Sequence, residues 1–426
     1  MVAWKQRVRL RKATLVRGAR QLLTLRGPSG PRRGADLRNL GIIQDGAVLF
    51  SDGLIREVGP SRRLENLALA RGAEEIDASG RVVMPGFVDS HAHLACGPAR
   101  ASDYEMRMGG ATDEQIARAG GGPLAAARAI HELSSRTLET LALRAIEEAV
   151  RHGTTALEAK SGLGITEAGE MKILRVQAGL RELPVTLVST FLATRVPTEF
   201  GRRLLPALRR RKLAEFAEVR CGAGLEEAAF TPEQACRYLS LARELGFGLK
   251  LNAGPRSNPC AIALAVEMGA ASVGHVAEAT ERDAMLLARS PTIATLMPGV
   301  LFQAETRRST TARRLIDGGA AVALASGYHP CDCPSQNMQM TIALACRTLQ
   351  MTAAEAIAAS TMNAAHAIGR SASIGSIEAG KSADLLMLSV PDYRELPYHF
   401  GVNLVDLVTS RGAVLVERSQ VKWPIR

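Results

Sequence analysis

The feature that most restricts the fold is a strand-and-helix unit that recurs from Pro85 to about residue 374. Short runs rich in Val, Ala and Leu, such as PVTLVSTFL, GFGLKLNA and AAVALAS, alternate with amphipathic segments of helix length, such as TLETLALRAIEEAVRHG and TPEQACRYLSLARELG. Repetition of this order predicts parallel strands joined by helices. Some eight units over roughly 285 residues favour a closed (β/α)8 barrel over an open sheet.

Both ends of the chain have a different texture. Residues 1–84 alternate short β-type runs with Gly, Pro and Asp, as in GAVLFSDGLIREVGP, and similar runs return after residue 374 in KSADLLMLSV and GAVLVER. Such alternation is typical of strands and tight turns. We therefore predict one composite β-sandwich domain from residues 1–84 and 375–426, with the barrel formed by residues 85–374.

Polar side chains follow several of the predicted barrel strands, at the end where barrel enzymes carry their chemistry. His91 and His93 close the first strand, and their i, i+2 spacing points both imidazoles to the same face. Asn252, His275 and Gly327 follow later strands. The loop after the last strand reads HPCDC, with His329, Cys331, Asp332 and Cys333. These residue types indicate a metal or nucleophile site.

The run PGFVDSHAHL resembles the first barrel strand of the amidohydrolase superfamily, and the chain as a whole resembles the imidazolonepropionase family. The closer resemblance spans about residues 13–418 and rests on HAHLACGPARASDYEMRMGGATDEQIARAGGG, EAKSGLG, STFLATRVP, KLNAGPRSN, LMPG, ARRLIDGGAAVALAS and NAAHAIG. It implies a barrel with a composite β-sandwich, zinc or iron as the metal, and a homodimer. The implied activity is hydrolytic opening of the ring of imidazolone propionate.

The resemblance also implies four metal ligands, of which this chain keeps two. His91 and His93 match the first pair, whereas a third ligand His falls on Asn252 and a ligand Asp falls on Gly327. The position that the resemblance assigns to proton transfer is Pro255, whose side chain accepts no proton. These losses argue against ordinary imidazolonepropionase activity.

The remaining site residues divide between retained and altered positions. Arg100 matches the substrate-binding arginine implied by the resemblance, and His275 matches a site histidine. Arg195 stands where a substrate histidine is implied, and His329 stands where an asparagine is implied. We predict that Arg100, Arg195 and His329 bind an anionic or cyclic-amide ligand, because guanidinium groups pair well with carboxylates.

Three arrangements of the altered site stay open. In the first, His91, His93 and His275 form a rebuilt metal site. Its further ligand is Cys331, Cys333 or His329 from the loop, or the carbonyl of Asn252. In the second, a loop thiol such as Cys331 is the nucleophile, activated by a neighbouring imidazole such as that of His275. In the third, the site has lost its metal, and the loop thiols are ordinary.

Three functions follow from these arrangements. The leading hypothesis is an imidazolonepropionase-like amidohydrolase that hydrolyses a C–N bond of a small cyclic or anionic amide. The second is a catalytically inactive protein that binds a small molecule, and the third is an aminohydrolase, that is, a deaminase. Asn252 and Pro255 count against the third hypothesis at least as strongly as against the first.

The composition sets limits on partners and location. The net charge is +11, and eleven Lys and Arg residues lie within residues 1–38, but aromatic residues make up only 4% of the chain. No zinc-finger or RNP-type motif is present, so we interpret the basic clusters as solvated faces and predict no nucleic-acid partner. No stretch approaches the roughly 20 apolar residues of a membrane span. Seven scattered cysteines favour a reducing, cytoplasmic setting.

Overall fold

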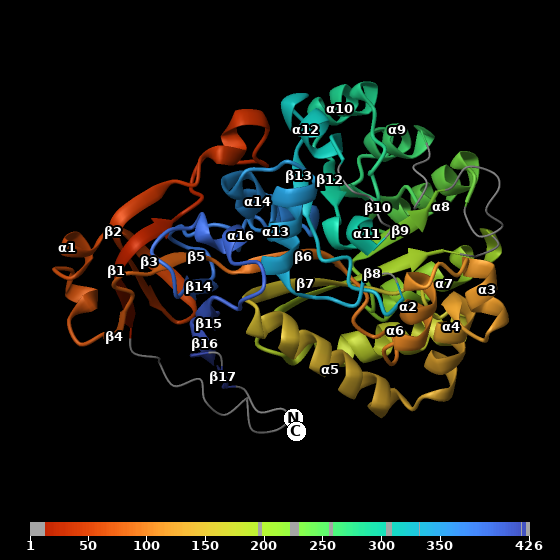
Figure 1. Cartoon of the computed structure of the whole chain (residues 1–426), viewed down its shortest axis with the longest axis horizontal. Coiled ribbons are helices and arrows are strands. Elements are labelled where there is room, and N and C mark those ends of the chain that lie inside the picture. The colour runs from red at the N-terminus through yellow and green to blue at the C-terminus, as the bar shows by residue number, and fades with distance from the viewer. Residues whose placement is uncertain are drawn as a thin grey trace.

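The computed structural model describes residues 13–194, 198–221, 230–254, 259–303, 309–331, 333–418 and 420–422, with only the backbone described at 198–202 and 259. Within these residues the chain forms an eight-stranded parallel sheet and a separate nine-stranded mixed sheet (Figure 1). No helix of the described part is long and apolar enough to cross a membrane.

The parallel sheet is the barrel, and its strands follow the chain in order around it. They are β6 (Phe87–Ala92), β7 (Thr154–Lys160), β8 (Thr186–Ala193), β9 (Phe216–Arg220), β10 (Gly248–Asn252), β11 (Ser272–Gly274), β12 (Ile293–Leu296) and β13 (Val322–Leu324). The first and last strands meet where Gly327 N donates to His91 O at 3.0 Å and His93 N donates to Tyr328 O at 2.9 Å. The barrel is therefore nearly closed, as the repeating units predict.

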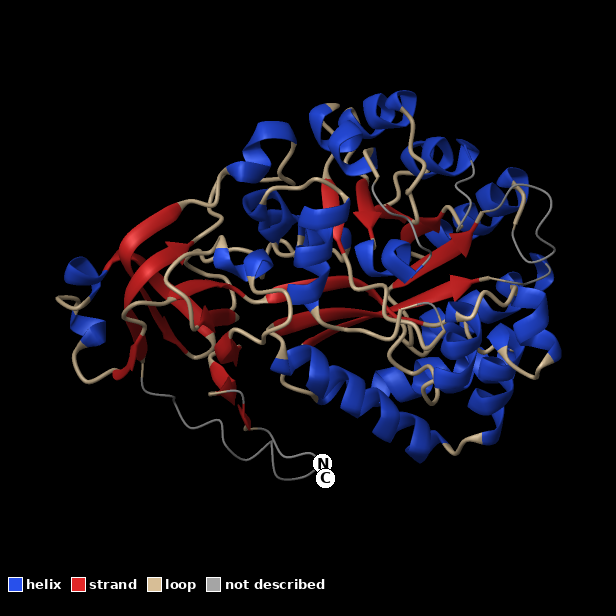
Figure 2. Ribbon diagram, viewed as in Figure 1, coloured by secondary structure: helices blue, strands red, loops and turns tan. Residues whose placement is uncertain are grey.

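Helices cover the outside of the barrel (Figure 2). The main ones are α5 (Ser135–Arg151), α6 (Glu167–Gly179), α7 (Thr198–Arg210), α8 (Pro232–Glu244), α9 (Pro259–Glu267), α10 (Glu281–Ala288), α12 (Thr311–Asp317) and α13 (Met338–Thr348). Several begin at a hydroxyl cap that satisfies a free backbone N–H: Thr231 Oγ1 accepts from Gln234 N before α8, and Thr166 Oγ1 accepts from Gly169 N before α6.

Shorter helices fill the connections. Three lie between β6 and α5, namely α2 (Ala101–Met108), α3 (Asp113–Arg118) and α4 (Gly122–Glu132). The others are α1 (Ser61–Leu64), α11 (Pro298–Gln303), α14 (Ala353–Ala359), α15 (Met362–Ala367) and α16 (Glu395–Tyr398), with 3-10 turns at Gly34–Arg38, Ala68–Ala70 and Leu180–Glu182.

The mixed sheet combines strands from both ends of the chain, as expected. Its path runs β17 (Gln420–Val421), β16 (Ala413–Glu417), β15 (Val405–Ser410), β14 (Leu385–Leu388), β5 (Val82–Pro85), β1 (Thr14–Leu23), β2 (Ile42–Ser51) and β3 (Leu54–Pro60), with β4 (Glu74–Asp77) paired to β1. In Figure 1 the red N-terminal strands and the blue C-terminal strands lie together at one end of the molecule. The predicted fold, a (β/α)8 barrel with a composite β domain, is confirmed.

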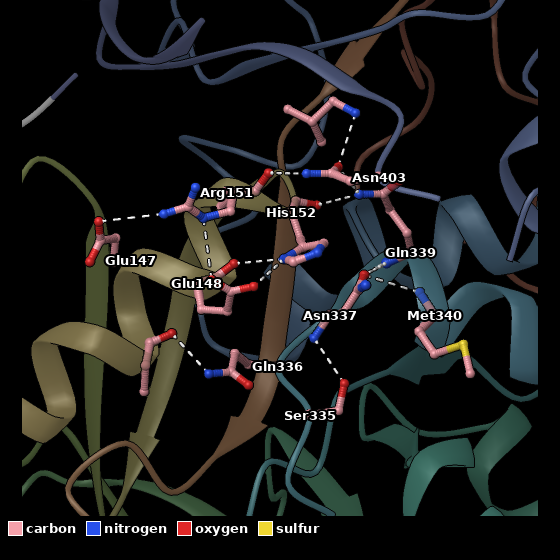
Figure 3. Close-up of polar contacts among 12 residues, drawn as sticks. Glu147, Glu148, Arg151, His152, Ser335, Gln336, Asn337, Gln339, Met340 and Asn403 are labelled. Atoms are coloured by element: carbon pink, nitrogen blue, oxygen red, sulfur yellow. Dashed lines mark hydrogen bonds and ion pairs between the residues drawn. The ribbon is translucent and has the colours of Figure 1, made fainter. Parts of the chain in front are cut away.

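A polar network joins the mixed sheet to the barrel (Figure 3). Gln339, at the start of α13, donates through Nε2 to Asn403 Oδ1 at 2.8 Å and to His152 O at 3.3 Å. Asn403 donates in turn to Arg151 O at 3.1 Å. Two side-chain amides therefore hold the end of α5, the start of α13 and the segment before β15 together.

Two of the basic N-terminal residues are structural, contrary to the interpretation as solvated faces. Arg32 is buried, and its Nη2 donates to Leu25 O at 2.9 Å. Arg33 Nη2 donates to Ser290 O at 2.6 Å, and its Nη1 donates to Gly319 O at 3.2 Å. A guanidinium at the end of a helix satisfies carbonyls that have no partner within the helix. The Arg33 guanidinium thus binds the N-terminal segment to the residues that follow α10 and α12.

Candidate active site

Four histidines meet at the carboxyl end of the barrel. The ring centres of His91 and His93 are 5.6 Å apart, His91 and His275 are 5.4 Å apart, and His93 and His329 are 5.3 Å apart. The order of contact is therefore His275, His91, His93, His329, and we call these four residues the histidine row. The structure brings together residues from three different strand ends that the sequence analysis selected.

Burial keeps the two central imidazoles uncharged. Desolvation lowers the pKa of His91 well below its ordinary value, and the Lys160 ammonium lowers it further. The pKa of His93 is lowered in the same way, first by burial and then by His329. Both rings therefore carry a free lone pair at neutral pH. Within the described residues, His93 Nδ1 is buried and has no hydrogen-bond partner.

The buried carboxylate of Asp89 binds the backbone at His91, one of the two central residues of the row. Asp89 Oδ1 accepts from Ser326 N at 3.0 Å and from His91 N at 3.3 Å, and its Oδ2 accepts from Ser326 Oγ at 2.5 Å. Burial raises the pKa of Asp89 to about 6, although these hydrogen bonds lower it in part. Asp89 carries no signal in the sequence, because it stands inside an apolar strand two residues before His91.

His275 has a strained backbone. Its φ is +58°, in the left-handed region that residues with a side chain seldom adopt. Such conformations persist where the surroundings enforce them, and they cluster at functional sites. His275 and His329, the two ends of the row, are both partly exposed, whereas His91 and His93 are buried.

Asn252 and Gly327 stand at the two positions where the resemblance implies metal ligands, and both now have structural roles in the loops that follow their strands. Asn252 is buried, and its Oδ1 accepts from Gly254 N at 2.9 Å, so this oxygen shapes the loop after β10. Gly327 has a φ of +66°, and a Cβ at this position would lie 2.7 Å from Val300 Cγ2. An aspartate at residue 327 would therefore require the backbone and Val300 to move. Pro255 lies outside the described residues.

The histidine row offers pairs of metal ligands. Two imidazoles that share one zinc ion have ring centres about 5 Å apart, so each neighbouring pair has a suitable spacing. However, no three His, Cys, Asp or Glu side chains among the residues that the structure describes are grouped so that they could hold an ion. These residues do not fit a resident ion with three or more protein ligands. The zinc or iron site stays a prediction.

The HPCDC loop turns back sharply beside the row. His329 N donates to Cys333 O at 2.9 Å, and Cys333 N donates to His329 O at 3.1 Å. Cys331 N donates to His329 Nδ1 at 3.2 Å, which places the proton of a neutral His329 on Nε2. Both thiols are buried, and Cys333 Sγ donates to Ser326 O at 3.4 Å. The predicted roles of Cys331 and Cys333 stay predictions, and Asp332 lies outside the described residues.

The arginine that matches the resemblance has a protein partner. Arg100 Nε and Nη2 donate to the two carboxylate oxygens of Asp103 at 2.5 and 2.9 Å. Asp103 also accepts from Gly122 N at 2.8 Å, which ties α2 to α4. A ligand carboxylate at Arg100 would compete with Asp103, and the role of Arg100 in substrate binding stays a prediction. Arg195 lies outside the described residues.

A buried network of four charges lies beneath the row. Lys160 Nζ pairs with Glu158 at 3.1 Å and also with Glu218, whereas Lys250 Nζ pairs with Glu158 Oε2 at 2.7 Å. All four side chains are nearly inaccessible. Burial lowers the pKa of Lys250 to about 8, and it also opposes the charge of Lys160, whose two carboxylate partners nevertheless raise its pKa. Lys160 is therefore an ion-paired interior residue.

The chain matches the amidohydrolase family over residues 82–414. It is 40% identical over 423 residues to the imidazolonepropionase of Symbiobacterium thermophilum, covering 96% of this chain and 98% of that one. It is 34% identical over 420 residues to that of Alkaliphilus metalliredigens, covering 96% and 99%. These similarities favour the hydrolase hypothesis over the binder and the deaminase.

Solved structures agree with the fold. A triazine hydrolase variant has a TM-score of 0.70 at 15% identity, covering 97% of both chains. An adenosine deaminase from Xanthomonas campestris with bound zinc has a TM-score of 0.67 at 17% identity, covering 96% of this chain and 94% of that one. The amidohydrolase family generally uses a divalent metal ion. This chain belongs to the amidohydrolase family, among its imidazolonepropionase-like hydrolases of non-peptide C–N bonds.

Proposed function

We propose that this chain hydrolyses a C–N bond of a small cyclic amide at the histidine row, with imidazolone propionate as the first compound to test. The main observation that supports this proposal is the histidine row, in which two uncharged, buried imidazoles lie at the carboxyl end of the barrel. The identity of 34–40% with imidazolonepropionases over nearly the whole chain supports the reaction class.

The chemistry requires a proton acceptor and a way to return the proton. Water adds to the amide carbonyl carbon as it loses a proton, the C–N bond then breaks, and the departing ring nitrogen takes up a proton. An imidazole that is uncharged at the working pH can accept the first proton. Burial keeps His91 and His93 in this form, and the same lowering of their pKa values makes each a weaker base than an exposed imidazole. His275, partly exposed at the mouth, is the proposed donor to the leaving nitrogen.

Substrate binding is proposed at Arg100 and His329, with Arg195, which lies outside the described residues, as a further candidate from the sequence. Arg100 is held rigidly by Asp103, and a rigid guanidinium recognises a carboxylate at a small cost in side-chain entropy. Nε2 of a neutral His329 donates, which suits a carbonyl oxygen or a carboxylate. The proposed substrate is therefore a cyclic amide that carries a negative charge. A cytoplasmic location and a homodimeric assembly complete the proposal.

The experiment is a ring-opening assay. Purified protein is incubated with imidazolone propionate and a panel of small cyclic amides, with and without chelator, and product is identified by mass spectrometry. We expect a product heavier than the substrate by one water, and a loss of at least about 100-fold in kcat/KM for His91→Ala and for His93→Ala. His399→Ala, in an exposed pair with Glu395, is the matched control.

Two outcomes oppose the proposal. Release of ammonia with retention of the ring would indicate a deaminase. Tight binding of the same compounds, shown by calorimetry, with no product after prolonged incubation would indicate an inactive binder. Light scattering on the same preparation gives the oligomeric state.

A further inference from the structure

Ser326 lies between the first barrel strand and the HPCDC loop, and every polar atom of this residue has a partner. It follows β13, and only 1% of its surface is exposed. Its N and Oγ both donate to Asp89, to Oδ1 at 3.0 Å and to Oδ2 at 2.5 Å. The hydroxyl also accepts from Tyr328 N at 3.0 Å, and the carbonyl accepts from Cys333 Sγ at 3.4 Å. Ser326 therefore binds β6 on one side and the HPCDC loop on the other.

The bond to Cys333 fixes His329 because these two residues are paired through their backbones. His329 N donates to Cys333 O at 2.9 Å, and Cys333 N donates to His329 O at 3.1 Å. On the other side of His329, Tyr328 O accepts from His93 N at 2.9 Å. The ring centre of His329 thus lies 5.3 Å from that of His93, on a loop that is bound at both ends.

Gly299, in the first turn of α11, packs against the same contact from a third direction. A Cβ at this position would lie 2.7 Å from Cys333 Sγ and 3.4 Å from Ser326 O. A carbon and a sulfur atom cannot approach as closely as the first of these distances, so only a residue without a side chain fits here. The backbone of α11 therefore packs directly on the contact between Cys333 and Ser326.

We propose that Ser326 is a positioning residue that holds the HPCDC loop, and with it the His329 imidazole, beside His93. Ser326 acts through its contacts with Tyr328 N and the Cys333 thiol, and Asp89 is the fixed group to which it is bound. A hydrogen bond from a hydroxyl to a carboxylate is stronger than one between neutral groups, which suits a contact that must not move. The kinetic part of this inference rests on the proposed function, in which His329 binds the substrate, whereas the position of the loop does not.

Two substitutions perturb this contact from different sides. Ser326→Ala removes only the hydroxyl, so the bond from Ser326 N to Asp89 Oδ1 remains, while Tyr328 N and Asp89 Oδ2 lose their partner. Gly299→Ala leaves the bonds to Asp89 in place, but its added Cβ collides with Cys333 Sγ and displaces the thiol from Ser326 O. Both variants should therefore loosen the loop without breaking the backbone connection between β6 and β13.

The test is the rate at which N-ethylmaleimide labels each cysteine of the folded protein, measured by peptide mass spectrometry. Cys333 is 3% exposed, and Cys221, which follows β9, is fully buried and reports general opening of the barrel. We expect both variants to label Cys333 at least about tenfold faster than wild type, with the rate at Cys221 unchanged, because the opening is local. We also expect KM for imidazolone propionate to rise about tenfold while kcat changes less than about threefold.

Ser382→Ala is the matched control. Ser382 Oγ donates to Asp384 Oδ1 at 2.5 Å beside β14, the same distance as in the barrel pair. This variant should lower the unfolding temperature while leaving the labelling of Cys333 and the KM unchanged.

The inference is overturned if folded Ser326→Ala labels Cys333 at the wild-type rate, or if Cys333 and Cys221 become reactive together. Gly299→Ala decides in the same way if Ser326→Ala does not fold. A wild-type protein without turnover refutes the proposed function, and the labelling rates then still decide whether Ser326 positions the loop.

Discussion

Replacing Lys250 by methionine isolates the energetic role of the buried charges beneath the histidine row. The wild-type network contains two ammonium groups and two carboxylates, so its formal charge is zero. Methionine has a similar length and keeps the contact with the Phe216 ring, whose centre lies 4.8 Å from Lys250 Nζ. It removes the 2.7 Å contact with Glu158 and leaves one excess negative charge in the barrel interior.

The expected loss is large. Removing one partner of a buried pair costs about 3–5 kcal/mol, because the remaining charge is left uncompensated. Glu158 retains Lys160 and the Thr190 hydroxyl as partners, which places the expected value near 3 kcal/mol. At about 2 °C per kcal/mol for a barrel of this size, the unfolding midpoint should fall by about 6 °C. The Lys250→Met/Glu158→Gln double variant should recover part of this loss, because the excess charge is gone.

The assay is denaturant unfolding followed by circular dichroism, with Arg63→Met as the surface control. Arg63 pairs with Glu57 in a half-exposed position, where an ion pair contributes about 0–1 kcal/mol. A loss below about 1 kcal/mol for Lys250→Met, or strict additivity in the double variant, would refute the reasoning about an uncompensated charge.

Three further predictions concern the site. Elemental analysis of protein purified without chelator should find less zinc or iron in His91→Ala than in wild type, because His91 belongs to two neighbouring pairs of the row; equal metal contents would exclude the row as a metal site. Gly327→Ala should cost about 1–3 kcal/mol because of its positive φ and the close contact at Cβ, whereas Gly401→Ala, with open space around it, should be neutral in the same thermal unfolding experiment. Arg100→Lys should raise KM for an anionic amide about tenfold with little change in kcat, because lysine cannot pair with Asp103 in bidentate fashion; an unchanged KM would exclude Arg100 from substrate binding.

The parts of the fold that can be predicted from the sequence are those in which a pattern of apolar and polar residues repeats along the chain. The alternation of apolar runs and amphipathic segments from residue 85 onward specifies the barrel, since each strand and helix shows its own period. The His91 and His93 pair was found because i, i+2 spacing at a strand end has few other uses. The four-charge network gave a weaker signal, because Glu218 and Lys250 are isolated polar residues within buried strands, and only the fold brings them together.

The rest of the site depends on contacts between residues far apart in the chain. Glu170 looks like an ordinary surface residue of an amphipathic helix, and nothing local indicates that its carboxylate accepts hydrogen bonds from Gly162 N and Gly164 N. Arg33 lies in a basic segment and looks solvated, yet it binds Ser290 O across 257 positions. The reshaping at Gly327 depends on Val300, which is distant in sequence but adjacent in the barrel. Local periodicity carries no information about these pairings.

The junction of Asp89 with Ser326 has a consequence for how the protein acquires activity. The hydrogen bond between them spans 237 positions. Asp89 belongs to the first barrel strand and is synthesised early, but it cannot form this bond until Ser326, which follows the last strand, has been synthesised. Contacts of such separation form late, because the entropy of closing the intervening chain must be overcome first. His91 and the turn at Gly327 meet at this junction, so a nascent or truncated chain lacking the final strand has no assembled row. Activity should therefore appear in refolding only with the slowest phase, after the helices have formed.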